Sequence, residues 1–245
     1  MIQTFFTPGV YSEDPIFLSI AHLGAIAAFA VFIFWFFIHR KKPYMKTVMR
    51  PVLISMLLLS EVSILIWTVS TGIWDVRFHL PLQLCTISLF LSIFMLISKK
   101  KWLVDVVYFF GIAGATQAIL TPDLYYSFPH FRYWHFFIAH IAIILSILYM
   151  IWVEGFRLTV KSAIRSYIFL NVIALFVFGI NYITGANYMF LSHKPEGPSI
   201  LDFLGPYPWY ILQLQLIVVL MYGLLYLPFH FIRHREINKQ KEGAN

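Results

Sequence analysis

Seven apolar stretches, each about 20 residues long, constrain what this chain can fold into. They cover residues 16–38, 52–74, 80–98, 102–121, 133–153, 166–188 and 209–232. A helix of roughly 20 apolar residues crosses the hydrocarbon core of a bilayer. Hydrophobic residues make up 60% of the chain and charged residues only 12%, which excludes a soluble fold. The sequence therefore predicts an all-α polytopic membrane protein, a seven-transmembrane-helix bundle in a single integral membrane domain over residues 1–245.

The distribution of lysine and arginine predicts the orientation in the membrane. All but three of the 18 Lys and Arg residues fall at one end of the predicted helices, and the exceptions are Arg77, Arg132 and Lys194. Short cytoplasmic loops carry such an excess of positive charge. We expect the N-terminus outside and the C-terminus in the cytoplasm of a bacterial cytoplasmic (cell) membrane. The net charge of +7 then reflects topology, and we expect no binding to nucleic acid.

Polar and ionisable side chains inside the predicted spans mark a candidate site, because such groups are unfavourable in lipid unless they face the bundle interior. At a rise of about 1.5 Å per residue, six helices place such a group within about 12 Å of their outer ends. The residues of this outer layer are His22, Cys85, Gln117, His135, His140, Asn181 and Gln213. Glu61 lies about 15 Å into its span, near the midplane. We expect a cavity open to the outer leaflet, with Glu61 as its floor and His22 as the partner of Glu61.

Several of these residues also have a purely structural interpretation. Gln117, Asn181 and Gln213 suit hydrogen bonds between helices, which are worth about 0.6 kcal/mol each. Two outer segments rich in proline and aromatic residues, 121–131 and 189–208, suit either a flap over the site or an ordinary aromatic belt.

Two further patterns predict ordinary packing. Asp105 follows Lys101 by one helical turn near the cytoplasmic face, so an ion pair between them is expected. Gly111 and Ala115 are four positions apart, which is the small-residue spacing of closely packed membrane helices.

Cys85 is the one cysteine of the chain, which excludes an internal disulfide and a multi-cysteine metal site. It shares a helix face with Ser88 and Ser92, so this face is small and polar and points into the bundle. A thiol becomes a nucleophile as the thiolate, and a nearby imidazole is the usual base. His135 and His140 lie about 140° apart around their helix, so only one of them faces Cys85. The alternative is an inert, buried cysteine.

Short motifs along the chain carry a resemblance to a known family. They are LPLQLC (80–85), TPD (121–123), FP (128–129), NYMFL (187–191), SILD (199–202) and GPYPWY (205–210), together with His140 and Pro195. In these motifs the chain resembles the YwaF-like integral membrane protein family. That family is similar to animal transmembrane protein 164, regarded as a cysteine-dependent phospholipid acyltransferase. It is distantly similar to the androgen-induced lipid hydrolases, which use a threonine and a histidine.

The resemblance implies that Cys85 is the nucleophile and His140 the general base of a lipid acyltransferase or lipid hydrolase. The family also has polar residues, without an assigned role, at the positions of His22, Glu61, Asn181 and Asn187. The candidate donors to an oxyanion are Gln83, Gln117, Asn181 and Tyr188. A phospholipid or lysolipid substrate is already in the membrane, so we expect no cofactor and no metal.

Other functions fit the same residues. A transporter would use Glu61 as a midplane proton site and the histidines as a relay, although the chain has no internal repeat. A haem protein would use His22 and His140 as ligands. A non-catalytic membrane assembly factor would need none of these groups.

Overall fold

The computed structural model describes residues 5–9, 16–195 and 200–242. Within these ranges the chain forms seven long helices and no strand. The helices are α2 (Ile20–His39), α3 (Arg50–Ser70), α4 (Leu84–Ser98), α5 (Lys101–Leu120), α6 (Phe131–Trp152), α7 (Val160–Thr184) and α8 (Trp209–Glu242). A π-helical turn precedes α3, and two 3₁₀ turns lie between α7 and α8. The all-helical prediction is confirmed for the described residues.

Six of these helices are long and apolar enough to cross a membrane, and α4 is the exception. With 15 residues, α4 is about 22 Å long, whereas the hydrocarbon core is about 30 Å thick. Large apolar side chains are exposed along α2, α7 and α8, where lipid would solvate them. The chain is therefore a multi-pass membrane protein.

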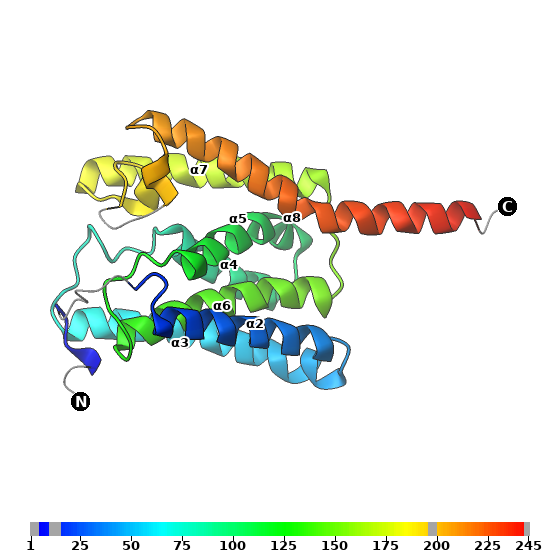
Figure 1. Ribbon diagram of the computed structural model, residues 1–245, viewed down its shortest axis with the longest axis horizontal. Coiled ribbons are helices and arrows are strands. Elements are labelled where there is room, and N and C mark those ends of the chain that lie inside the picture. The colour runs from blue at the N-terminus through cyan, green and yellow to red at the C-terminus, as the bar shows by residue number, and fades with distance from the viewer. Residues whose placement is uncertain (1–4, 10–15, 196–199, 243–245) are drawn as a thin grey trace.

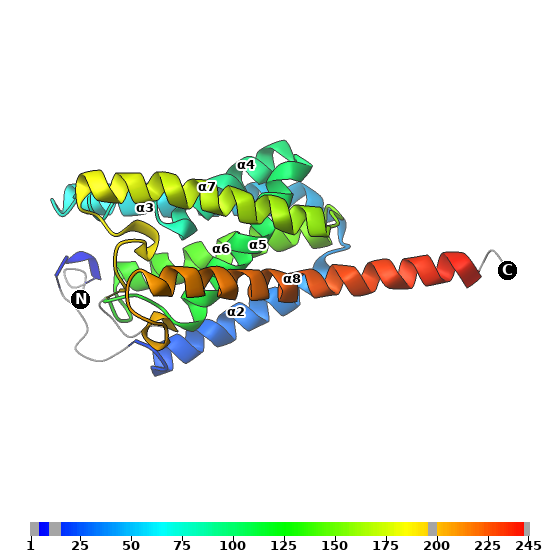
Figure 2. The same cartoon turned by 90° about the horizontal axis from the view of Figure 1, so that it is seen from above.

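The helices lie side by side, and their connections alternate between the two ends of the bundle (Figure 1). We call the end with the connections 40–49, 99–100 and 153–159 the basic end, and the end with the connections 71–83, 121–130 and 185–208 the long-loop end. The last part of α8 projects beyond the other helices at the basic end in both views (Figure 2). Residues 196–199 of the predicted outer flap lie outside the described residues, Ser199 of the SILD motif among them.

The third predicted helix begins later than the sequence suggests. The apolar pattern predicts a helix over residues 80–98, but α4 starts at Leu84. Leu80 precedes a proline, a position at which helical backbone is disfavoured. Instead, the amide of Leu82 donates to the carbonyl of Leu80 (2.8 Å) in a tight turn. The prediction that this helix starts at residue 80 is wrong.

The sixth predicted helix is shifted toward the N-terminus. Hydropathy predicts 166–188, whereas α7 starts at Val160 because Thr159 and Ser162 form a capping box. Gly185 ends the helix in the left-handed region (φ 70°). Two other helices end elsewhere than predicted, since α3 ends at Ser70 instead of residue 74 and α8 continues to Glu242, beyond residue 232. Capping residues set both boundaries of α7, and average hydropathy does not detect them.

The core of the bundle is the contact between α5 and α6, whose inner faces are largely buried. A Cβ added at Gly111 would lie 2.8 Å from Cδ1 of Ile147, and Ala115 is also buried. The predicted close approach at these small residues is confirmed. Around this pair, α3 packs on α6, and α4 packs on both α5 and α6.

Asp105 links α5 to α7 at the basic end. The expected pair with Lys101 is present (2.6 Å), but Asp105 is buried and also pairs with Arg165 of α7 (2.6 Å). The hydroxyl of Ser162 donates a third hydrogen bond to the same carboxylate (2.8 Å). Asp105 is therefore more than a charge at a helix end, because three groups on two helices satisfy it.

Candidate functional site

Cys85 is the second residue of α4 and is half-buried. Since α5 is five residues longer than α4 and joins it at the basic end, α4 stops about 8 Å short of the long-loop end. The backbone amides of Leu84, Cys85 and Thr86 have no acceptor among the described residues. A helix N-terminus with free amides stabilises a thiolate and also an oxyanion. The thiol thus lies below the bundle surface, beside unpaired backbone donors.

The inward direction of this helix face is confirmed by its serines. Ser88 and Ser92 are both buried, and the hydroxyl of Ser88 donates to the carbonyl of Leu84 (2.7 Å). The hydroxyl of Ser92 has no partner within the described ranges. Cys85 lies one turn nearer the long-loop end than Ser88, on the same small, polar face.

Residue counting from the basic end places Cys85 and His140 at a similar height in the bundle. α4 and α6 pack against each other, and both run from the long-loop end to the basic end. The ion pair between Lys99 and Glu154 (2.6 Å) brings their basic ends together. Cys85 precedes Lys99 by 14 positions, and His140 precedes Glu154 by the same number. Both residues are therefore about 21 Å from this ion pair, whereas His135 is about 8 Å nearer the long-loop end.

His140 carries its proton on the nitrogen that faces its own helix. The Nδ1 atom of this buried imidazole lies 2.6 Å from the carbonyl oxygen of Phe136. A carbonyl can only accept a hydrogen bond, so Nδ1 donates. In the neutral imidazole the lone pair is then on Nε2, which is the arrangement that a general base requires.

His135 has the opposite tautomer because of Arg132. The guanidinium Nη1 of Arg132 lies 3.1 Å from Nδ1 of His135, and a guanidinium can only donate. The neutral His135 ring therefore carries its proton on Nε2, which is buried and without a partner in the described part of the chain. His135 is a hydrogen-bond donor, whereas His140 has the lone pair of a base.

No hydrogen bond joins Cys85 to either histidine within the described residues. Cys85 and His140 lie on adjoining helices at a similar height by residue counting, and they are not hydrogen-bonded to each other. The pairing of these two residues therefore remains a prediction.

Arg132 lies beside His135 but is not among the candidate residues that the sequence predicts. It lies in the first turn of α6, is half-buried, and pairs with no carboxylate among the described residues. Positive-charge counting treated it as a marker of topology alone. Its spacing of three positions from His135, which places both on one helix face, is the signal that points to a shared site.

Two of the candidate oxyanion donors, Tyr188 and Gln83, hold loops together. The hydroxyl of Tyr188 donates to the carbonyl of Val76 (2.6 Å) and accepts from the amide of Leu80 (2.8 Å). The side chain of Gln83 accepts from the amide of Met189 (3.0 Å). These bonds fasten the α7–α8 connection onto the segment that leads into Cys85.

Four further predicted residues bond within or beside their own helix ends. Asn181 binds both the amide and the carbonyl of Tyr188 (2.9 Å each). Asn187 accepts from the amides of Ser192 (3.0 Å) and His193 (3.1 Å) in its own loop. The remaining two pairs are Gln117 with Thr121, and Gln213 with the amide of Gly205 (2.6 Å). Gln117, Asn181 and Gln213 therefore bond to a loop or within their own helix end, and the predicted hydrogen bonds between helices are not found for them among the described residues.

The expected pair of Glu61 with His22 is absent. The His22 ring is fully buried, accepts from the amide of Leu18 at Nδ1 (3.0 Å) and donates to the carbonyl of Ile119 at Nε2 (2.8 Å). Both ring nitrogens are therefore occupied, which also leaves no nitrogen for a haem iron. Glu61 is half-buried on α3 and has no hydrogen bond or ion pair with any described residue. The prediction of His22 as the partner of Glu61 is wrong.

Comparison with models of known protein families identifies a match over most of the chain. The model of the TMEM164 family matches residues 11–226, a range that contains α2 to α7, most of α8 and every candidate residue described above. No curated protein and no solved structure matches the chain significantly.

Proposed function

Because this chain belongs to the TMEM164 family, we propose that it is a membrane-embedded lipid acyltransferase or lipid hydrolase. Cys85 is the nucleophile and His140 is the general base, in a pocket that opens to the outer leaflet. The observation that carries this proposal is the imidazole of His140, whose lone pair is on Nε2, on a helix that packs against the helix of Cys85.

The reaction uses groups of the chain itself. Nε2 of His140 takes the thiol proton, and the Cys85 thiolate attacks the ester carbonyl carbon of a glycerolipid. The amides in the first turn of α4 stabilise the oxyanion of the tetrahedral intermediate. The C–O bond to the glycerol then breaks, and His140 returns the proton to the leaving lysolipid. The acyl chain remains on sulfur as a thioester until a lysolipid hydroxyl or water attacks it.

Arg132 and His135 suit recognition of the substrate's phosphate. Both present hydrogen-bond donors, and the guanidinium lacks a carboxylate partner among the described residues. Arginine binds phosphate with two parallel hydrogen bonds. A phospholipid whose phosphate lies at the first turn of α6 extends its ester groups deeper into the bilayer, toward the level of Cys85.

The same proposal includes the topology. α4 is a seventh, short crossing, completed at the long-loop end by residues 71–83. The basic end is cytoplasmic, so the N-terminus is outside and the C-terminus is inside a bacterial cell membrane. Along its length α4 packs against α3, α5 and α6.

The direct test is lipid turnover by purified protein with phospholipid as donor and lysolipid as acceptor. Cys85→Ala is expected to abolish turnover, and Ser88→Ala, on the same helix face, is the matched control. Unchanged turnover in Cys85→Ala would refute the proposal. Release of free fatty acid without acceptor would assign hydrolysis, and formation of a new diacyl lipid would assign transfer.

A second candidate function rests on Glu61. A carboxyl group within a membrane span and without a described partner is a typical proton site of a transporter. Proton flux into vesicles that is lost in Glu61→Gln but retained in Cys85→Ala would favour transport. If the protein shows neither lipid turnover nor flux, the non-catalytic assembly role is favoured.

A further inference from the structure

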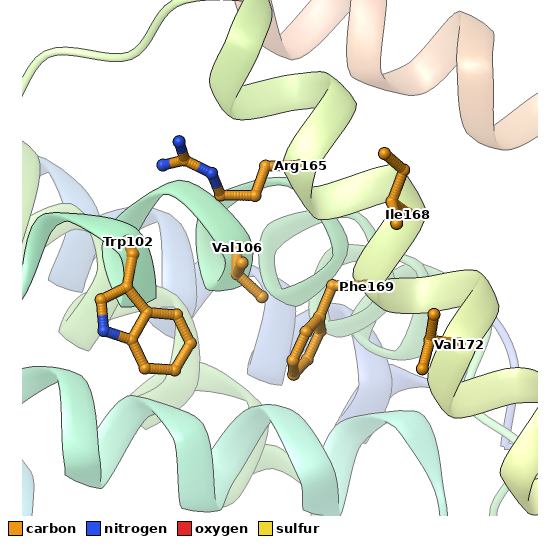
Figure 3. Close-up of a pocket in the computed structure, with 6 residues that line it drawn as sticks. All are labelled: Trp102, Val106, Arg165, Ile168, Phe169 and Val172. Carbon is orange, nitrogen blue, oxygen red and sulfur yellow. The ribbon is translucent and has the colours of Figure 1, made fainter.

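A groove lies on the outside of the bundle at the basic end, between α5 and α7. It has a volume of about 260 Å³ and is lined by Trp102, Val106, Arg165, Ile168, Phe169 and Val172. The rings of Trp102 and Phe169 lie on opposite sides of it (Figure 3). Phe169 stacks on the buried ring of Phe110, with centroids 6.2 Å apart, so this wall is held from within the bundle.

The rim of the groove is positively charged. Arg165 pairs with Asp105, yet its side chain is 54% exposed. Lys101 shares the same carboxylate, so two cations surround one anion. Lys161 is exposed one turn before Arg165 on the same helix face. The groove therefore combines an apolar floor with a net positive rim.

We propose that this groove binds an anionic phospholipid of the leaflet that contacts the basic end. One acyl chain lies between Trp102 and Phe169, and the phosphate contacts Arg165 and Lys161. The volume is below the roughly 300 Å³ of typical small-molecule pockets, which suits part of one chain whose remainder stays in the bilayer. The site is at the opposite end from Cys85, so it is separate from the proposed acyl transfer.

Quenching of Trp102 tests this assignment. The full chain is reconstituted in two kinds of phosphatidylcholine vesicle. One contains a minor share of dibrominated phosphatidylglycerol, and the other contains the same share of dibrominated phosphatidylcholine. The signal of Trp102 is the difference between the wild type and Trp102→Phe. Brominated phosphatidylglycerol is expected to quench Trp102 more strongly. Lys161→Gln is expected to lower this preference about fivefold, the effect of one basic residue near a membrane surface, and added salt is expected to weaken it.

A matched pair of valines tests the groove itself. Val172→Phe fills the groove, whereas Val219→Phe changes an equally lipid-exposed position on α8. Val172→Phe is expected to remove most quenching of Trp102 by either lipid, and Val219→Phe to leave it unchanged. Equal quenching by the two lipids in the wild type would overturn the anionic assignment. Equal quenching in the two valine variants would overturn the groove as the binding site.

Discussion

At the scale of single residues, the proton positions on His135 and His140 determine whether the free nitrogen of each ring donates or accepts a hydrogen bond. Phe136 fixes the tautomer of His140, and Arg132 fixes that of His135. The sequence identifies both imidazoles as candidates but cannot separate them, because the tautomer depends on which atom each ring nitrogen meets in the folded chain. The lone pair on Nε2 of His140 is the reason that we propose this residue, and not His135, as the base.

Glutamine variants separate the two roles. Glutamine at position 140 cannot accept the thiol proton, so His140→Gln is expected to lower lipid turnover by roughly 10²- to 10⁴-fold. His135→Gln retains an amide donor and is expected to lose much less. Rates measured at saturating phospholipid make this comparison. A larger loss in His135→Gln than in His140→Gln would assign the base to His135.

Tyr188 is expected to control access to Cys85. Tyr188→Phe removes the bonds to Val76 and Leu80, at a cost of about 1 kcal/mol, and loosens the segment before α4. Thermal unfolding should shift to lower temperature, and a maleimide should label Cys85 faster. Tyr182→Phe, at an exposed position on α7, is the control and should change neither. Unchanged labelling in Tyr188→Phe would contradict this role of the loop.

At the scale of helices, caps and ion pairs determine where helices begin and which helix ends meet, and hydropathy predicts neither. Apolar runs located all seven helices, but the start of α4 depends on the proline-containing turn at 80–82 and the start of α7 on Thr159. The pair between Lys99 and Glu154 joins the end of α4 to the segment after α6. No periodicity in the sequence specifies that contact between helices.

The ion pair at the basic end is expected to make stability depend on pH. Burial alone would raise the pKa of Glu154, but hydrogen bonds from Lys99 and Tyr149 lower it below its ordinary value. A carboxyl whose pKa is lower in the folded state stabilises that state above its unfolded pKa, and this contribution is lost as the pH falls through the folded pKa. At neutral pH the pair is worth about 1 kcal/mol or less.

Thermal unfolding of wild type and Glu154→Gln at several pH values measures this contribution. The wild type is expected to be more stable at neutral pH, and the difference should shrink as the pH falls below about 4.5. Lys99→Gln should follow the same profile, since it removes the other partner. A difference that stays constant from neutral to acid pH would contradict the assignment.

At the scale of the whole molecule, hydropathy and charge predict the fold class, and the family match is consistent with it. The arrangement of the site was less predictable. The sequence predicts one cavity for the outer layer of polar residues, yet Asn181 and Gln213 bond to loops, and His22 bonds to backbone. Side chains at one depth share a site only if they point to the same place, and hydropathy carries no such information.

Cysteine labelling tests the orientation, because the chain has a single native cysteine. In a Cys85→Ala background, Ser127→Cys lies in an exposed connection at the long-loop end and Lys100→Cys is exposed at the basic end. A membrane-impermeant maleimide added to intact cells should label Ser127→Cys at once and Lys100→Cys only after permeabilisation. The reverse pattern would invert the proposed topology.

The central claim, that Cys85 carries an acyl chain during turnover, is tested most directly by the mass of the intact protein after incubation with phospholipid. The account predicts a mass increase of one acyl chain, mapped to the peptide that contains Cys85 and removed by hydroxylamine. Cys85→Ser should not form a hydroxylamine-labile thioester, and His140→Gln should form the adduct much more slowly. Turnover of phospholipid without any adduct on Cys85, or an equal adduct in Cys85→Ala, would contradict the account.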